Sequence, residues 1–195
     1  LESEIGPLPR DGRGGVTARD EVRAGDERVI SITWSTPSGL DTSRIDHAEA
    51  IAELDSTVRF WQRWSEHTRY DGPYRDAVER SALDIKGLTD GKTGAVIAAA
   101  TTSLPETIGG VRNWDYRYCW LRDGAMTAEA LAHLGSATEG MEFLDWVLGV
   151  LDRTHAPEQL RPLYTLGGDD LGSEGEIGEL AGYAGSRPVR IGNAA

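Results

Sequence analysis

Apolar positions three or four residues apart predict a helix over residues 46–66. The stripe that carries this pattern consists of Ile51, Leu54, Val58 and Trp61. Upstream, residues 28–35 alternate in side-chain character and contain several β-branched residues, which predicts a strand. Residues 1–25 follow neither period and are rich in glycine and charged residues, so we expect a loop or tail there.

The helical period returns in the second half of the chain. It predicts helices over about 74–88 and about 120–134, the latter ended by Gly135. Ser136 and Glu139 have the spacing of a capping box, which predicts the start of a further helix. Its predicted apolar face consists of Met141, Leu144, Leu148 and Leu151, and its predicted polar face of Glu142, Asp145, Gly149 and Asp152. Helices joined by short loops, without alternating strands, indicate a mainly α fold.

Two segments between these helices are not helical in pattern. Residues 94–100 are short and apolar, and their period fits a buried extended segment as well as the start of a helix. Residues 156–185 are rich in glycine, which predicts a long loop, and loops on a helical scaffold often carry binding residues.

Composition narrows the possible partners. The 195 residues include 20 Lys and Arg against 32 Asp and Glu, a net charge of −12, which argues against nucleic acid or an anionic membrane and suits a neutral solute. The need for solubility explains the same charge. No apolar run approaches the roughly 20 residues of a membrane-spanning helix, and the sequence opens without a signal pattern, so we expect a cytoplasmic protein.

Cysteine and histidine usage predicts neither a disulfide nor a metal. Cys119 is the only cysteine, so no intrachain disulfide forms, and we interpret it as a small buried thiol. The four histidines lack ligand spacing, so we expect no metal and no cofactor.

One segment concentrates the candidate chemistry. Residues 113–123, NWDYRYCWLRD, contain four aromatic residues, two arginines and two aspartates. Aromatic rings stack on the apolar face of a pyranose, while Asp and Arg make directional hydrogen bonds to its hydroxyl groups. The segment therefore fits a sugar site, although an aromatic core segment with a surface Arg–Asp pair has the same composition.

This segment, preceded by SLPETIGG at 103–110, resembles the hallmark of glycoside hydrolase family 15, the glucoamylase and trehalase-like enzymes. Residues 70–106 and the block LAGYAGSRPVRIGNAA at 180–195 are similar to the family as well, in the same order. The resemblance implies the opening helices of an (α/α)6 barrel, preceded by the tail of an N-terminal β-sandwich domain. The implied domains are 1–40 for the sandwich remnant, 41–70 for a linker helix and 71–195 for the first part of the barrel.

The resemblance also implies the roles of particular residues. Arg122 and Asp123 match the pair that holds hydroxyl groups of the terminal glucose, and Trp120 is the expected stacking platform. Tyr116 is a further candidate, although core packing explains it too. Arg190 follows Pro188 in the second block, where it either contacts the sugar or pairs with carboxylates, and we favour the sugar contact. The nearby acids Glu174, Glu176 and Glu179 are interpreted as a solvated face and not as catalytic groups.

Enzymes of this family release glucose from the non-reducing end of α-glucosides with inversion. Inversion uses two carboxyl groups about 6.5–9.5 Å apart, one as the acid and one to activate water. The resemblance places both glutamates beyond the 180–195 block, so we expect no catalytic residue within the chain. The expected substrate is an α-glucan, a maltooligosaccharide or trehalose, and the motifs do not separate glucoamylase from trehalase. The alternative is a non-catalytic glucan-binding or regulatory protein on the same scaffold. The sequence does not predict an oligomeric state.

The helix count leads to a first testable prediction. A closed double ring needs about twelve helices and this sequence predicts roughly four, which leaves apolar helix faces without partners. We therefore expect the isolated 195 residues to be marginally stable and inactive. Calorimetry of the purified chain tests this, and a cooperative melt at high temperature would contradict it.

Overall fold

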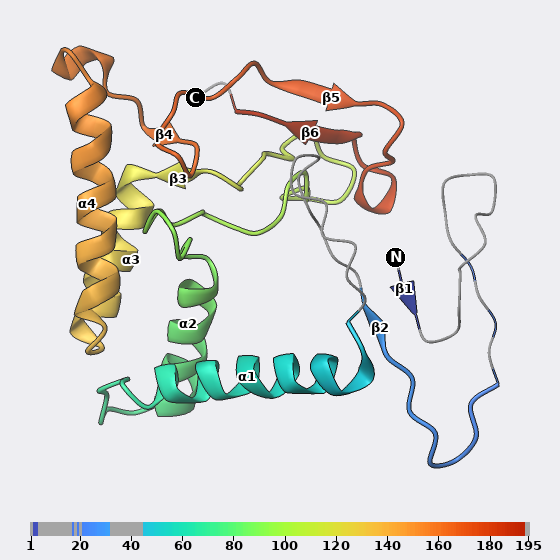
Figure 1. The fold of residues 1–195 in the computed structure, drawn as a ribbon. Coiled ribbons are helices and arrows are strands. Elements are labelled where there is room, and N and C mark those ends of the chain that lie inside the picture. Colours follow the sequence, from blue (N-terminus) through green and yellow to red (C-terminus); the bar gives the residue numbers. More distant parts are fainter. Residues whose placement is uncertain (1, 4–16, 18, 20, 32–44, 194–195) are drawn as a thin grey trace. The chain divides into compact units, whose positions relative to one another are not determined.

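The computed structural model describes residues 2–3, 17, 19, 21–31 and 45–193 (Figure 1). The chain divides into two compact units, residues 1–63 and 64–195, which are treated separately below. Among the described residues, none of the helices has the length and apolar character needed to cross a membrane.

In the first unit, β1 (Glu2–Ser3) pairs antiparallel with β2 (Ile30–Ser31). The predicted strand at 28–35 is confirmed at Ile30–Ser31, while residues 32–35 lie outside the described part of the chain. Most of the predicted tail at 1–25 also lies outside it. Helix α1 (His47–Ser65) confirms the helix predicted at 46–66.

A capping box starts α1. The Asp46 amide donates to Glu49 Oε2 at 3.0 Å, and the Glu49 amide donates to Asp46 Oδ1 at 2.9 Å. This exchange satisfies two backbone donors that the first turn of a helix leaves unpaired. The capping box that the sequence predicted at Ser136 is wrong, because the Ser136 side chain makes no capping hydrogen bond.

The second unit contains the other three helices, α2 (Arg75–Gly87), α3 (Leu121–His133) and α4 (Ala137–Arg153), close to their predicted ranges. Helices α3 and α4 form an antiparallel pair, packed side by side (Figure 1). Gly135 ends α3 as predicted. With φ +99 it turns the chain so that the Ser136 amide donates to the Leu131 carbonyl at 2.9 Å and its own amide to Ala132 at 3.1 Å.

Short antiparallel ribbons complete this unit. Strand β3 (Cys119–Trp120) pairs with β4 (Leu163–Tyr164), and β5 (Gly175–Ile177) pairs with β6 (Val189–Ile191). Single turns of 3-10 helix, η2 (Pro157–Gln159) and η3 (Tyr183–Gly185), lie in the loop that the glycines predicted. The chain is thus mainly helical, as expected, while the barrel, the β-sandwich and the domain limits 1–40, 41–70 and 71–195 stay predictions.

The core of this unit is aromatic. Phe143 stacks on Trp146 with ring centroids 5.7 Å apart, and Trp146 meets Tyr164 edge-on at 6.3 Å. Ala95, Val96 and Cys119 are buried against this cluster. Residues 94–100 are therefore not a helix start. Residues 94–96 are buried, and Val96 bridges to Thr89 in antiparallel fashion, whereas residues 98 and 100 are exposed.

The buried face of α4 differs from the predicted one. Its buried residues are Glu139, Phe143, Trp146 and Val150. The predicted apolar face is instead exposed, with exposures of 57% at Met141, 46% at Leu144, 49% at Leu148 and 44% at Leu151. Helix α4 is apolar on two sides, so periodicity did not decide which side packs. Gly124 of α3 decides it, because a Cβ there would lie about 2.4 Å from the Phe143 ring.

The buried Glu139 carboxylate joins three parts of the second unit. It accepts a hydrogen bond from Trp64 Nε1 at 2.6 Å and pairs with Lys86 Nζ at 2.9 Å. Burial raises the pKa of Glu139, but these two donors outweigh burial and lower it overall. The stabilisation is therefore present at neutral pH and is lost as the pH falls through the lowered pKa.

The second prediction concerns this carboxylate. Removing one member of a buried ion pair leaves its partner uncompensated, so Glu139→Ala should lower the free energy of unfolding by about 3–5 kcal/mol. Glu142→Ala, at an exposed position of the same helix, is the matched control and should change it little. Urea denaturation measures both variants. Equal effects would show that the Trp64–Glu139–Lys86 contacts contribute nothing specific.

Candidate functional site

Residues 113–123 are held by backbone hydrogen bonds to residues 98–103, which precede them in the sequence. The amides of Ala98 and Ala99 donate to the carbonyls of Tyr118 and Tyr116, each at 3.0 Å, and the Ser103 amide donates to Trp114 at 3.0 Å. The two stretches thus run antiparallel as an irregular ribbon. This backbone pairing sets the direction of alternate side chains along the motif.

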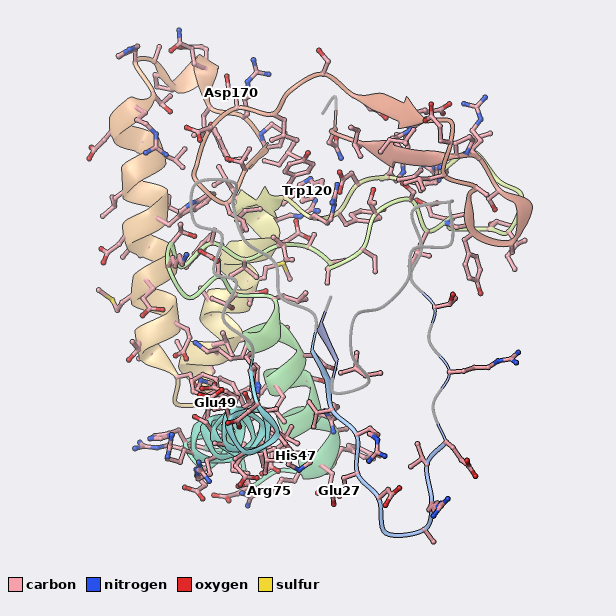
Figure 2. All side chains as sticks on the ribbon, turned by 45° about the vertical axis from the view of Figure 1, so that its right-hand side comes forward. Glu27, His47, Glu49, Arg75, Trp120 and Asp170 are labelled. Carbon is pink, nitrogen blue, oxygen red and sulfur yellow. The ribbon has the colours of Figure 1, made fainter. Side chains whose placement is uncertain are left out.

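Two of the predicted residues form an aromatic platform. The rings of Tyr116 and Trp120 lie 6.0 Å apart and are tilted by 42°. Trp120 ends β3 and directly precedes α3, with its side chain half-buried (Figure 2). The structure therefore brings Tyr116 and Trp120 together with part of their ring surface accessible, as stacking on a sugar requires.

Arg122 and Asp123 occupy the first turn of α3, directly after the platform. Arg122 Nη2 contacts Asp123 Oδ2 at 3.1 Å, and their side chains are 79% and 45% exposed. An exposed ion pair contributes little to stability, so both groups are available to a ligand at low cost. Together they present hydrogen-bond donors and acceptors in the helical turn that directly follows Trp120.

Asp115 is the buried centre of the motif. Its carboxylate accepts two hydrogen bonds from Arg117, from Nε and Nη2 at 2.9 Å each, and one from the Gly192 amide at 3.1 Å. Burial raises the pKa of Asp115, but the Arg117 and Gly192 donors outweigh it, so the pKa lies below 3.8. The first sequence block thereby binds the backbone of the second.

Only glycine fits position 192 without strain. Its φ of +79 is costly for other residues, and a Cβ would lie 2.8 Å from the Ser173 carbonyl oxygen. The absence of a side chain therefore lets the Gly192 amide reach Asp115.

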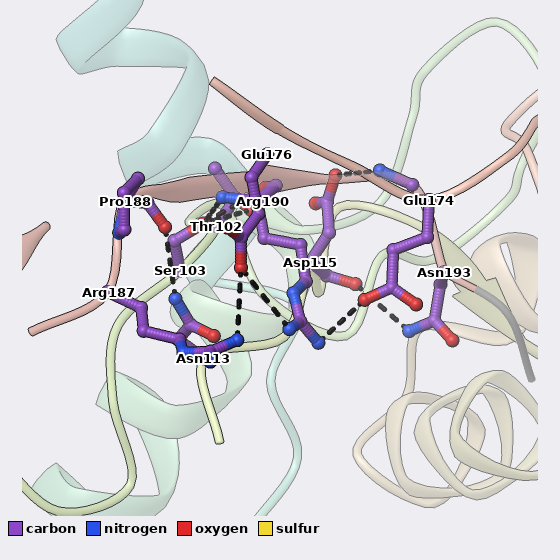
Figure 3. Close-up of polar contacts among 11 residues, drawn as sticks. Thr102, Ser103, Asn113, Asp115, Glu174, Glu176, Arg187, Pro188, Arg190 and Asn193 are labelled. Carbon is purple, nitrogen blue, oxygen red and sulfur yellow. Dashed lines mark hydrogen bonds and ion pairs between the residues drawn. The ribbon is translucent and has the colours of Figure 1, made fainter. Parts of the chain in front are cut away.

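A second set of bonds fixes Arg190 by its backbone (Figure 3). Ser103 Oγ accepts from the Arg190 amide at 2.6 Å, and Thr102 Oγ1 donates to the Arg190 carbonyl at 2.6 Å. Asn113 Nδ2 donates to the Pro188 carbonyl at 3.1 Å. Residues 102–103 and the motif thus hold β6 and its flanking residues at alternate positions, 188, 190 and 192.

The Arg190 guanidinium is mostly buried. It lies 5.0 Å from the centroid of the Trp114 ring, and its Nη1 approaches Glu174 at 2.6 Å, with Glu176 at 3.7 Å. The structure therefore places Arg190 in a cluster with Trp114 and Glu174, whereas Arg122 and Asp123 pair with each other. Its contact with sugar stays a prediction.

The sequence did not predict the ion pairs that Glu174 and Glu176 form. The interpretation as a solvated face missed the pairing of both with Arg190. Glu176 lies directly opposite Arg190 in the β5–β6 register, where opposite charges are favourable, but the sequence predicted a loop here and so gave no register.

Cys119 is a buried thiol. Burial raises the pKa of the Cys119 thiol to about 11, so at neutral pH it is a protonated core group, as expected. Within the part of the chain that the structure describes, no three His, Cys, Asp or Glu side chains gather into a metal site.

Comparison with known proteins places this arrangement in a family. The model of the glycosyl hydrolases family 15 matches residues 72–195. The chain belongs to glycosyl hydrolase family 15. The resemblance inferred from the two sequence blocks is thereby confirmed.

Relatives of this family 15 chain include named enzymes. A trehalase of Thermoplasma acidophilum is 45% identical over 147 residues, which cover 75% of this chain and 25% of that protein. A trehalase of Mycolicibacterium smegmatis is 39% identical over 180 residues, 91% of this chain and 26% of that protein. An isomaltose glucohydrolase of Kribbella flavida is 36% identical over 74 residues, 38% of this chain and 17% of that protein.

In each comparison the matched residues make up a larger share of this chain than of the relative. The chain spans about a quarter of the length of the trehalases that it matches. No solved structure matches the family 15 chain at a significant level.

The third prediction follows from the Asp115 network. Asp115→Asn removes the charge that holds Arg117 and Gly192, and a hydrogen bond to a charged group contributes about 1.5–3 kcal/mol. We expect a loss of stability in that range and faster amide hydrogen exchange at Gly192. Asp145→Asn, at an exposed position of α4, is the control. Unchanged exchange at Gly192 would contradict the role of Asp115 in holding this segment.

The network also predicts a pH dependence. Because the pKa of Asp115 is lowered in the folded chain, its stabilisation persists above the ordinary carboxyl value of 3.8 and is lost only as the pH falls through the lowered value. The exchange protection of Gly192 should therefore survive to pH 4 in the wild-type chain.

Proposed function

We propose that the protein is a glycoside hydrolase that releases glucose from trehalose by an inverting mechanism. In this proposal, the chain supplies a wall that binds glucose, made by Tyr116, Trp120, Arg122, Asp123 and Arg190. The two catalytic glutamates belong to sequence outside these 195 residues. The alternative substrate specificity within the family is glucoamylase-like action on an α-glucan or a maltooligosaccharide.

The observation that carries the proposal is the exposed Arg122–Asp123 pair, which follows the Tyr116–Trp120 platform directly in the chain. The platform offers ring surface to the apolar face of a pyranose, while the pair offers directional hydrogen bonds to its hydroxyl groups. A sugar held in this way is positioned for reaction at its anomeric carbon. Positioning of this kind accounts for several kcal/mol of a lowered barrier.

Charge supports the same role for Asp123. The transition state of glycoside hydrolysis resembles an oxocarbenium ion, so positive charge develops on the sugar ring. A carboxylate next to the bound ring stabilises that charge more strongly than it stabilises the neutral substrate, which is the condition for faster reaction.

The choice of trehalose rests on the relatives. Two proteins that are named trehalases match 75% and 91% of the chain, whereas the isomaltose glucohydrolase matches 38%. Glu174 and Glu176 are engaged by Arg190, so we assign them to holding that arginine and not to bond cleavage.

The fourth prediction tests this function. The protein expressed from its complete reading frame should release β-glucose from trehalose faster than from maltose, because inversion at the attacked anomeric carbon yields the β-anomer. The second glucose of trehalose leaves as the α-anomer, since its own C1–O bond is not broken, so the two anomers should appear in equal amounts early in the reaction. Asp123→Ala should lower kcat/KM by at least about tenfold, while Asp145→Ala, which removes an exposed acid on α4, should leave it unchanged. Proton NMR of the released anomer, taken early in the reaction, makes the measurement.

Other outcomes have defined meanings. Hydrolysis of maltose faster than that of trehalose would indicate glucoamylase specificity and not trehalase specificity. Binding of glucan without any release of glucose would favour the non-catalytic regulatory protein. If Asp123→Ala and Asp145→Ala behave alike, Asp123 does not contribute to the site.

A further inference from the structure

A small hollow is lined in part by Leu163, the cross-strand partner of Trp120. In the β3–β4 register, Trp120 lies opposite Leu163 and Cys119 opposite Tyr164. Directly opposed residues share one face of a ribbon, so Leu163 lies on the Trp120 face while Cys119 and Tyr164 face the core. Leu163 forms part of the wall of a hollow of about 200 Å³.

The residues around this hollow come from three separated segments. They are Arg161, Leu163, Leu171, Gly172, Ser173, Glu174 and Asn193. One arginine and one glutamate give the lining no net charge, and the half-buried Leu171, in front of the buried Leu163, supplies apolar surface. A neutral ligand with many hydroxyl groups and an apolar face fits this combination better than an ion does.

Two of the lining residues connect the hollow to the candidate site. Glu174 makes the ion pair with Arg190, and Asn193 Nδ2 lies 3.5 Å from the Asp115 carbonyl. The Glu174 oxygen that approaches Arg190 is shielded from solvent, and the contact lacks hydrogen-bond geometry. The hollow is thus bordered by the same contacts that join the two sequence blocks.

Arg161 is the lining residue whose side chain remains available. Its amide donates to the Tyr164 hydroxyl at 2.8 Å, which anchors the backbone on the core. Its side chain is 55% exposed, and Nε pairs at 3.2 Å with Asp170, which is itself 64% exposed. Exchange of this exposed pair for a ligand costs little, and a guanidinium offers several donors in a fixed plane.

We propose that the hollow is a subsite for the second sugar unit of a disaccharide and that Arg161 binds hydroxyl groups of that unit. The inference rests on the proposed function, in which the first glucose lies on Trp120. Leu163 links the two, because it shares a ribbon face with Trp120 and lines the hollow. Arg161 is then a residue that determines specificity for a disaccharide over glucose.

The experiment uses the protein expressed from its complete reading frame. Arg161→Gln should raise KM for trehalose about tenfold, as expected for loss of a hydrogen bond from a charged group. The inhibition constant of glucose, which binds at the platform in this scheme, should stay within about twofold, a change below 0.5 kcal/mol. Arg161→Lys keeps the charge but not the planar fork, so its effect should be intermediate. Calorimetric titration with trehalose checks the same difference without relying on turnover.

The matched control is Arg112→Gln. Arg112 is also an exposed arginine in an ion pair with a carboxylate, Glu106 at 3.2 Å, and it does not line the hollow. Equal effects of Arg112→Gln and Arg161→Gln on KM would overturn the subsite. A parallel loss of glucose inhibition and trehalose affinity in the Arg161 variants would do so too, since it indicates a general structural effect.

The two proposals fail in different ways. If the wild type hydrolyses no glucoside, the proposed function fails, and calorimetry still decides the role of Arg161. Weaker trehalose binding by Arg161→Gln than by Arg112→Gln would then support the subsite, and absence of trehalose binding to the wild type would overturn it. If trehalose is hydrolysed and KM is unchanged in Arg161→Gln, only the subsite fails.

Discussion

The buried carboxylate of Asp115 is the contact on which the candidate site depends. A fully buried charge is tolerated only when its hydrogen bonds are satisfied, and Asp115 satisfies them with Arg117 on one side and the Gly192 amide on the other. Residues 77 positions apart are thereby held together. Because β6 is fixed here, Arg190 meets Trp114, and the hollow lined by Leu163 has a defined wall.

The aromatic core gives this arrangement a rigid support. Cys119 and Tyr164 face the Phe143–Trp146 stack, while the opposite face of the same ribbon carries the buried Leu163 and the half-buried Trp120. Gly124 allows α3 to approach Phe143 closely. The position of Arg122 and Asp123 in the first turn of α3 thus follows from packing that lies behind them.

The helices were predictable because apolar spacing and terminators are local signals, as at Gly135. The packing side of α4 was not, since Met141 and Phe143 are both apolar and only the tertiary partner at Gly124 separates them. Glu139 fits a capping box by spacing, but long-range bonds to Trp64 and Lys86 determine its place, while Asp46 and Glu49 form the actual box. Of the candidate site, composition and motif indicated Trp120 and its neighbours. The pairing of Glu176 with Arg190 depends on a strand register that the glycine-rich loop conceals.

The contact between Gly192 and Asp115 also bears on how sequences in this family are compared. Position 192 needs a positive φ and has no room for a Cβ, so backbone geometry alone accounts for a glycine there. A glycine at the corresponding position of a homologue would therefore carry no information about which sugar that homologue recognises. The Arg161 side chain is exposed, so packing does not restrict the residue at position 161. Under the subsite proposal, homologues with different substrate preferences should differ at this position.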